Sequence, residues 1–305
     1  MNISHTLYSG AQGWDKLQDI ILEYSKSGIY ILVDENTNKF CLPGLRQKCR
    51  GLENALVIEV PGSESNKTIA SIEKIWEQLV DGGAVRNSLM ICLGGGVITD
   101  IGGFAASTFK RGMNFVHIPT TLLAMVDAAL GGKTGVNLNA IKNQVGVFAP
   151  PESVFVFTEF LSSLPTRQIL SGYAEMLKHA MIDGETLFNR LIGLSAPEQI
   201  INEKDILESA AVKMKIVTED LDEKGIRKVL NLGHTIGHAI EAYSQKNDPD
   251  PLLHGEAIAI GLVCEAFISM HMFGMPENDV KRLVSQVTRF YPHYRLKAKS
   301  TDELL

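Results

Sequence analysis

The chain has 305 residues, of which 45% are hydrophobic and 21% are charged, and its formal net charge at pH 7 is −6. This balance excludes a disordered chain, because the apolar residues suffice for a sizeable core. The acidic charge argues against nucleic acid as a partner, since a nucleic-acid-binding domain presents a basic face to phosphates.

The cysteines and the apolar runs indicate where the protein works. Four widely spaced cysteines without a C-x-x-C pair are typical of a reducing compartment. The N-terminus MNISHTLYSG lacks the basic and apolar regions of a signal peptide. The most apolar run, AIAIGLVCEAFISM, contains Glu265 and is shorter than the ~20 residues that a membrane span needs. We therefore expect a cytoplasmic protein without a membrane partner.

The first half of the chain alternates short β-branched runs with helical patterns. The segment KTIASIEKIWEQLVDGG has apolar residues three and four apart, which predicts a helix. Strands that alternate with helices indicate a parallel sheet covered on both faces, so an α/β domain is expected over residues 1–160. The runs expected to form its strands are GIYILVDENT, NALVIEVPG, SLMICLGGG, NFVHIPTT and SVFVFTEF.

A triple-glycine turn follows one of these strands, in SLMICLGGGVITDIGGFAAS. It is interpreted either as a tight connection from strand to helix or as a backbone cradle for a pyrophosphate at the helix N-terminus. The G-x-G-x-x-G pattern is absent, because Thr99 stands in the place of its third glycine. Asp100, near the helix start, is expected to bind hydroxyl groups or to cap the helix.

The stretch DAALGGKTGVN ends like a phosphate-binding P-loop but is not one. Asp127 occupies the place of the first glycine, and its carboxylate would repel a phosphate. We expect this stretch and the following AIKNQVG to form a glycine-rich loop. Asp127, Lys133, Lys142 and Asn143 there suit a polar, anionic small molecule, although a solvated loop has a similar composition.

After Pro165 the strand patterns stop and the apolar periodicity is helical, which predicts an all-α domain over residues 161–305. Ser300 and Glu303 match a capping box just before the last residue, so this domain is expected to be truncated at its C-terminus. The segments expected to be helical are RQILSGYAEMLKHAMI, DILESAAVKMKIVTEDL, RKVLNLGHTIGHAIEAY, HGEAIAIGLVCEAFISM and ENDVKRLVSQVTRF.

The helical half carries several histidines and glutamates on apolar helices. A lone histidine there is more often a core residue, but a shared metal ion would satisfy several buried polar groups together. The H-E-x-x-H protease motif is absent, because Thr235 occupies the place of its glutamate. Spacing alone indicates a Zn²⁺ or similar site and leaves its ligands open among Glu175, His179, His234, His238, His254 and Glu256.

The segment VKMKIVTEDLDEKGIRKVLNLGH is rich in both signs of charge. It is interpreted either as a solvated surface or as one wall of the metal site. In the second case Lys213 and Arg227 would clamp a carboxylate or phosphate, which Arg binds through two parallel hydrogen bonds.

Seven segments in register resemble the dehydroquinate synthase family over residues 30–270. They are PGSESNK, GGGVITDIGGFAASTFKRG, IPTTLLAMVDAALGGKTGVN, KNQVGVFAPP, LSGYAEMLKHAMI, NLGHTIGHAIE and LHGEAIAIG. The resemblance implies an NAD⁺-binding α/β domain, an α-helical domain that carries Zn²⁺ or Co²⁺, and a cytoplasmic homodimer. It also implies a carbon–oxygen lyase of the shikimate route to chorismate and the aromatic amino acids, which turns 3-deoxy-D-arabino-heptulosonate 7-phosphate into 3-dehydroquinate and phosphate.

The resemblance also implies roles for particular residues. The implied metal ligands are Glu175, His234 and His254, and the implied catalytic residues are His238, Glu223 and Lys178. The residues implied to bind the substrate, a small sugar-acid phosphate, are Arg111, Asp127, Lys133, Asn143, Lys213, Arg227 and Asn231. The residues implied to bind NAD⁺ are Asp34, Asn36, Glu64, Lys67, Gly95, Gly96, Val97, Asp100, Thr120, Thr121, Lys142, Phe160 and Ser163.

Three alternatives stay open at this point. Another sugar phosphate cyclase would share the motifs, but Lys213, Arg227, Asn231 and His238 favour an acidic substrate. A metal-dependent polyol dehydrogenase of the glycerol dehydrogenase type would accumulate NADH, whereas a cyclase recycles its cofactor. The third is a relative without activity: family members continue beyond this chain's end and carry another substrate lysine there, so impaired turnover is expected.

Overall fold

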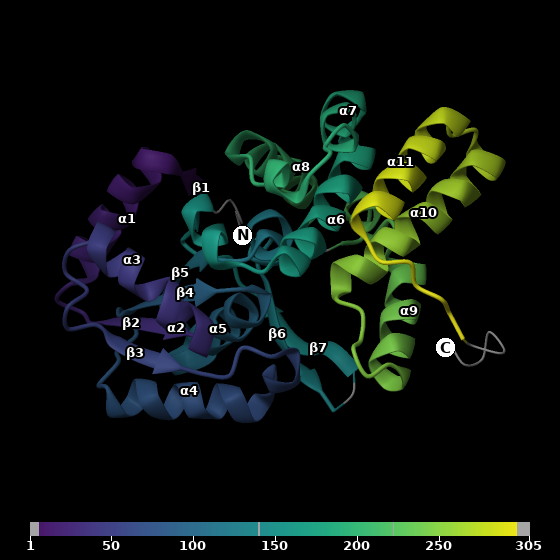
Figure 1. Ribbon diagram of the computed structural model, residues 1–305. Coiled ribbons are helices and arrows are strands. Elements are labelled where there is room, and N and C mark those ends of the chain that lie inside the picture. The colour runs from purple at the N-terminus through teal and green to yellow at the C-terminus, as the bar shows by residue number, and fades with distance from the viewer. Residues whose placement is uncertain (1–5, 140, 222, 298–305) are drawn as a thin grey trace. The chain divides into compact units, whose positions relative to one another are not determined.

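The computed structural model describes residues 6–139, 141–221 and 223–297 (Figure 1). The chain divides into two compact units, Met1–Leu164 and Pro165–Leu305. The boundary expected after residue 160 falls inside the short helix Thr158–Ser163, which belongs to the first unit. The expected capping box at Ser300 and Glu303 lies outside the described residues.

A six-stranded parallel sheet forms the centre of the first unit, with the strand order β1-β8-β5-β4-β2-β3. Every residue of β2 and β4 is buried, as expected for a parallel sheet that is covered on both faces. The predicted α/β class is confirmed, and β1 is a strand that the sequence patterns did not indicate. The strands are β1 (Thr6–Ser9), β2 (Ile29–Val33), β3 (Leu56–Glu59), β4 (Leu89–Gly94), β5 (Asn114–Pro119) and β8 (Ser153–Val156).

Two hydrophobic clusters cover the two faces of this sheet. Ile31 of β2 packs in one cluster with Leu17 and Leu45, whereas its neighbour Leu32 packs in the other with Ile72 and Ile101. Successive strand residues thus face opposite clusters. The helices that supply them are α1 (Gly10–Tyr24), α3 (Leu42–Lys48), α4 (Ile69–Asp81) and α5 (Gly96–Thr108). The short helix α2 (Glu35–Phe40) follows β2.

The expected glycine-rich loop is confirmed only for residues 129–132, where Gly131 and Gly132 have φ of 88° and 68°, and it is wrong from Lys133 onward. The chain there forms an antiparallel hairpin of β6 (Lys133–Leu138) and β7 (Ile141–Phe148). Gly135 faces Gly146 across the pair, and a Cβ atom on Gly146 would lie 2.2 Å from the carbonyl oxygen of Thr134. The glycines therefore allow two strands to approach closely, and only the cross-strand pairing reveals that role.

The second unit is helical in its described residues, as predicted. Gly233, in the left-handed conformation with φ of 79°, separates the 3₁₀ helix Ile226–Asn231 from α9. The single helix expected from Arg227 through His238 is therefore interrupted. The helices are α6 (Thr166–Asp183), α7 (Glu185–Ile192), α8 (Glu203–Glu219), α9 (His234–Asn247), α10 (His254–Phe273) and α11 (Glu277–Phe290).

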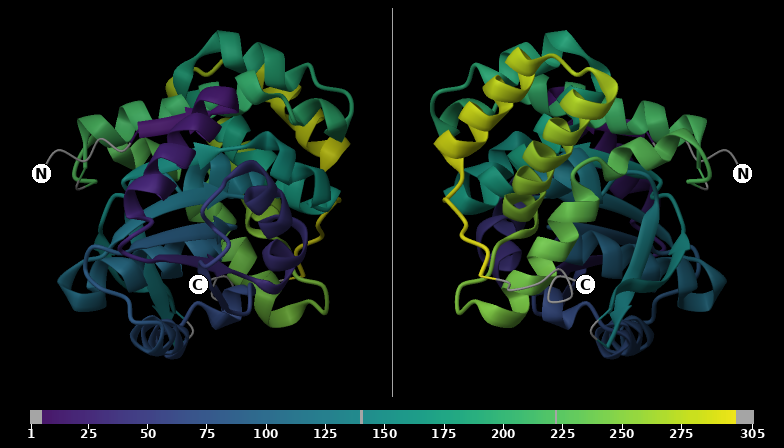
Figure 2. Two further views of the ribbon diagram at one scale, coloured as in Figure 1. Left: turned by 90° about the vertical axis from the view of Figure 1, so that its left-hand side faces the viewer. Right: turned by 90° about the vertical axis from the view of Figure 1, so that its right-hand side faces the viewer.

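Helix α10 is the central helix of this unit and packs against α6, α9 and α11 (Figure 2). A Cβ atom on Gly255 would lie 1.9 Å from the carbonyl oxygen of Ser171, and one on Gly261 would lie 1.9 Å from that of Gly233. By length and composition alone α10 could cross a membrane. Its close contacts with three helices are those of a core helix.

Candidate functional site

Three helices of the second unit bring a buried carboxylate next to two imidazoles. Glu175 of α6 is fully buried, and its Oε1 atom lies 3.5 Å from Nε2 of His234 and 3.4 Å from Nε2 of His254. With ligand bonds of about 2.0–2.1 Å, a tetrahedral Zn²⁺ ion separates its donor atoms by about 3.3–3.4 Å. The two distances therefore fit donors arranged around one small divalent ion.

His238 lies in the same cluster. Donor atoms of His234, His238 and His254 all lie within 4.8 Å of one another. His238 follows one turn after His234 on α9, and their ring centroids are 5.1 Å apart. It is exposed, whereas Glu175 is not. The structure thus joins all four residues, while the division between metal ligands and a proton-transferring His238 stays a prediction.

Hydrogen bonds orient the two imidazoles next to Glu175. Nδ1 of His234 lies 3.1 Å from the carbonyl oxygen of Leu232, and Nδ1 of His254 lies 3.3 Å from Oε2 of Glu241. If Nδ1–H donates in each case, Nε2 presents its lone pair to the centre of the cluster, as a metal ligand must.

Burial and nearby carboxylates act oppositely on these two histidines. Burial lowers the pKa of His234 and outweighs the attraction of Glu175. Burial also opposes protonation of His254, but hydrogen bonds to Glu175 and Glu241 raise its pKa to about 9. If His254 binds a metal, it must first lose this proton, because only a neutral imidazole is a metal ligand.

Lys178 forms an ion pair with Glu175 one turn earlier on α6. Both side chains are buried, with exposed fractions of 1% and 0%. The ammonium group therefore compensates the carboxylate in the low-dielectric interior. His179, which the spacing had left open as a ligand, has its Nδ1 atom 2.9 Å from Oγ of Ser209 on α8.

The loop between α8 and α9 carries three of the predicted residues. The Asp220 carboxylate accepts hydrogen bonds from three backbone N–H groups, including that of Arg227 at 3.0 Å. These bonds outweigh desolvation and lower the pKa of Asp220. Nδ2 of Asn231 donates to Oε1 of Glu223 at 3.3 Å. Arg227 is 2% exposed, and Lys213 of α8 is also buried, so this loop is not simply a solvated charged surface.

In the first unit, several of the predicted NAD⁺ residues follow three neighbouring strands. Asp34 follows β2, Gly95 follows β4 and Thr120 follows β5. Carboxyl ends of parallel strands meet at one edge of a sheet, where open α/β sheets bind their ligands. Gly95 starts α5 without a side-chain cap, and a Cβ atom on it would lie 2.9 Å from Cγ2 of Thr121. The turn after β4 therefore lies against the turn after β5. Gly96 and Val97 form the first turn of α5.

Asp34 also has a structural task. Its Oδ1 atom accepts the backbone N–H groups of Asn36 and Thr37 at 2.9 Å, which caps α2. Burial raises the pKa of Asp34 although these hydrogen bonds oppose the rise. Gly62 passes close to it, because a Cβ atom there would lie 2.8 Å from Cβ of Asp34.

A polar network joins residues predicted for NAD⁺ and for the substrate. Nζ of Lys67 lies 2.5 Å from Oδ2 of Asp100 and also donates to Oδ1 of Asn143. Asn137 of β6 donates to Oε1 of Glu64 at 2.9 Å and accepts the backbone N–H of Asn143 at 2.9 Å. No role was predicted for Asn137, although it ends the stretch GKTGVN, because its contacts depend on the hairpin.

The remaining predicted residues of the first unit come from several other elements. Phe160 is 7% exposed and packs edge-on against Phe157 and Trp14, so its side chain belongs to the core. Ser163 hydrogen-bonds the thiol of Cys41. The rest are Arg111 at the end of a 3₁₀ turn, Asp127 in the π-helical turn Ala124–Ala128, Lys133 on β6 and Lys142 on β7.

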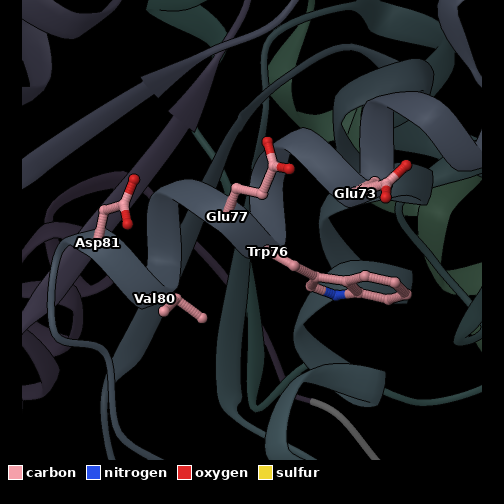
Figure 3. A pocket seen from close by; sticks show the side chains of 5 residues that line it. All are labelled: Glu73, Trp76, Glu77, Val80 and Asp81. Carbon is pink, nitrogen blue, oxygen red and sulfur yellow. The ribbon is translucent and has the colours of Figure 1, made fainter.

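The surface along α4 has a hollow. It is lined by Glu73, Trp76, Glu77, Val80 and Asp81, with the acidic side chains one turn apart (Figure 3). The lining contains none of the residues predicted for NAD⁺, substrate or metal. Nε1 of Trp76 donates to the carbonyl oxygen of Ala105, so the indole joins α4 to α5.

Known proteins are similar to this chain over most of its length. Residues 57–171 match the 3-dehydroquinate synthase N-terminal family and residues 172–305 match the C-terminal family. The chain is 43% identical over 279 residues to a 3-dehydroquinate synthase of Parabacteroides distasonis, covering 91% of this chain and 78% of that protein. It is 39% identical over 293 residues to that of Pyrococcus furiosus, with coverage of 94% and 85%.

A solved structure shares the architecture. It is 2-deoxy-scyllo-inosose synthase in complex with carbaglucose-6-phosphate, NAD⁺ and Co²⁺, with a TM-score of 0.80 and 29% identity, covering 98% of this chain and 82% of that one. Two matched family models and two relatives of about 40% identity thus point to the same family. The chain belongs to the 3-dehydroquinate synthase family of enzymes.

Proposed function

We propose that the protein converts 3-deoxy-D-arabino-heptulosonate 7-phosphate into 3-dehydroquinate and phosphate, with NAD⁺ recycled in each turnover and one divalent metal. The observation that carries this proposal is the buried carboxylate of Glu175 within 3.5 Å of two oriented imidazoles, with a third imidazole beside them. Its relatives of similar sequence are named for this activity.

Glu175, His234 and His254 would hold Zn²⁺ or Co²⁺. Either ion, once bound, would act as a Lewis acid on a substrate oxygen. Lys178 balances the charge of Glu175, so the carboxylate stays ionised in the interior. The set of one carboxylate and imidazole nitrogens suits both metals.

His238 would carry protons, because it is exposed on α9 and can exchange them with substrate, whereas His234 and His254 are only partly exposed. Glu223, on the loop between α8 and α9, would assist His238 in proton transfer. Asn231 donates a hydrogen bond to the Glu223 carboxylate and so holds it in place. Lys213 and Arg227 of the second unit, and Arg111 and Lys133 of the first, would bind the anionic groups of the substrate, whereas Asp127, Asn143 and Asn231 would bind its hydroxyl and other polar groups. These positioned cations would favour the departure of phosphate as its negative charge develops.

The first unit would bind NAD⁺, which when bound would supply hydride-transfer chemistry at a substrate carbon that bears a hydroxyl group. The start of α5 at Gly95 would receive the pyrophosphate, since its backbone N–H groups point along the helix axis. Asp34 would accept ribose hydroxyl groups. The network of Lys67, Asp100 and Asn143 would hold the side chains that bind the cofactor and those that bind the substrate in fixed positions relative to each other.

A turnover assay tests the proposal. The chain is incubated with the heptulosonate phosphate, NAD⁺ and Zn²⁺ or Co²⁺, and phosphate and NADH are followed together. We expect one phosphate per substrate consumed and no accumulation of NADH. NADH that accumulates without phosphate would identify a polyol dehydrogenase. Phosphate released only from another sugar phosphate, such as glucose 6-phosphate, would identify a different cyclase.

We further propose a cytoplasmic homodimer. The four cysteines are free, as in a reducing compartment, and the dimer is an expectation from the family resemblance. Light scattering after gel filtration tests it, and a monomeric mass at assay concentration would contradict it.

A further inference from the structure

Glu241 is a buried carboxylate on α9 that the roles above do not use. It is 4% exposed, and it lies two turns after His234 on the same helix. Its Oε2 atom is 3.3 Å from Nδ1 of His254, and its Oε1 atom accepts a hydrogen bond from Nε2 of Gln245 at 3.2 Å. A side chain of α9 thus reaches the imidazole at the start of α10.

The contact with Glu241 determines which nitrogen of the His254 ring faces the centre of the cluster. Its Nε2 atom lies 3.4 Å from Oε1 of Glu175, while Nδ1 faces Glu241. With the Nδ1 proton held by Glu241, Nε2 keeps its lone pair for a metal. His234 obtains the same orientation from a backbone carbonyl, that of Leu232. The orientation of the His254 ring therefore depends on a side chain, whereas that of the His234 ring depends on the main chain.

We propose that Glu241 is a positioning residue that fixes the tautomer and rotation of His254 and raises its basicity toward the metal. The inference rests on the proposed metal site. A carboxylate that accepts the second N–H of a ligating imidazole tunes metal affinity by about 10- to 100-fold. Burying a carboxylate is costly, which a merely space-filling role would not require.

Metal affinity separates this role from a structural one. Zn²⁺ affinity is measured by competition with a chromophoric chelator, and the geometry is followed by the visible spectrum of bound Co²⁺. We expect Glu241→Ala to weaken Zn²⁺ binding by about 10- to 100-fold and to change the Co²⁺ spectrum. Glu241→Gln keeps the acceptor but loses the charge, so its affinity should fall between that of Glu241→Ala and the wild type.

Gln245→Ala is the matched control, because it removes another hydrogen-bond partner of Glu241 and leaves the contact with His254. It should bind Zn²⁺ like the wild type. If Glu241→Ala does not fold, the Zn²⁺ affinity of Glu241→Gln tests the proposal, because glutamine is nearly isosteric with glutamate. Wild-type Zn²⁺ affinity in Glu241→Gln would overturn the proposal, because the proposal assigns part of the effect to charge.

A double-mutant cycle shows whether Glu241 acts through His254. In a His254→Ala background, Glu241→Ala should not weaken Zn²⁺ binding further. An equal loss in both backgrounds would overturn the positioning role. A wild-type protein that binds no metal, or a His254→Ala variant with unchanged affinity, would instead contradict the proposed metal site.

Discussion

Lys133 and Lys142 lie on opposite strands of one hairpin and are predicted to serve different ligands. Hydrogen bonds to charged groups contribute about 1.5–3 kcal/mol. Lys133→Ala should therefore lower kcat/KM for the sugar phosphate by about 10- to 100-fold, with the dissociation constant of NAD⁺ unchanged. Lys142→Ala should weaken NAD⁺ binding instead. Steady-state kinetics and NAD⁺ titration measure both, and two variants that affect the same ligand would contradict the assignment.

Glu175 and Lys178 form a buried ion pair, so removing one charge leaves the other uncompensated. Glu175→Gln should abolish metal binding and lower the free energy of unfolding of the metal-free protein by about 3–5 kcal/mol. Urea unfolding with a chelator present measures this. The control is Glu277→Gln on α11, whose pair with Lys281 is exposed on both sides and should contribute little. Similar stability in both variants would show that Glu175 is not held as a buried ion.

Single residues differ in how well sequence predicts their contacts. His234 and His238 were expected to be neighbours because a helix places residues four apart on one face, and the structure brings them together. Glu241 and Asn137 were missed. Their partners, His254 and Glu64, belong to other elements, so only the packing of α10 against α9 and of the hairpin against Glu64–Asn66 reveals their positions.

At the scale of elements, α9 and α10 meet through glycines. A Cβ atom on Gly261 would lie 1.9 Å from the carbonyl oxygen of Gly233, which directly precedes His234. Replacing a helical glycine by alanine ordinarily stabilises a helix by roughly 0.5–1 kcal/mol. Overpacking costs about 1–3 kcal/mol and should outweigh that gain here. Gly261→Ala should thus lower stability and weaken Zn²⁺ binding by displacing His234.

Gly44→Ala on α3 is the matched control, because its nearest neighbour, Cε1 of Phe160, lies at 3.6 Å. It should leave stability unchanged or slightly higher. Thermal unfolding and the Zn²⁺ competition assay measure both variants. A stabilised Gly261→Ala protein with normal metal affinity would show that α9 and α10 can separate without affecting the ligands.

Elements with strong local patterns were predicted well. The fully buried strands β2 and β4 are continuous apolar runs, and the amphipathic α4 has helical periodicity, so each pattern is determined by the element's own residues. The hairpin β6–β7 was mistaken for a loop because Gly135 and Gly146 look like loop residues until they are paired. The start of α9 at His234 was missed because the apolar pattern continues through Gly233, where the backbone turns left-handed.

At the scale of the whole molecule, strand order depends on contacts between distant segments. β1 pairs with β8, so that Thr6 lies opposite Ser153. β1 has only four residues, none of them fully buried, and therefore lacks the pattern of a buried strand. The alternation of strands and helices predicted a parallel sheet, but the place of β1 in it depends on pairing that no local pattern records.

The two units offer separate probes of the two cofactors, because all predicted NAD⁺ residues lie in the first unit and all predicted metal ligands lie in the second. Both tryptophans of the chain, Trp14 and Trp76, belong to the first unit, so their fluorescence reports its unfolding. A ligand at 100 times its dissociation constant stabilises the native form by about 2.7 kcal/mol. NAD⁺ should therefore raise the midpoint followed by tryptophan fluorescence.

Zn²⁺ should act mainly on the helical unit, whose unfolding dominates the loss of helical circular dichroism. We expect Zn²⁺ to raise the midpoint seen by circular dichroism more than the midpoint seen by fluorescence, and NAD⁺ to do the reverse. His254→Ala is the control and should remove the response to Zn²⁺ while keeping that to NAD⁺. Equal shifts of both midpoints with either ligand would mean that the two units unfold together, and a Zn²⁺ response in His254→Ala would place the metal elsewhere.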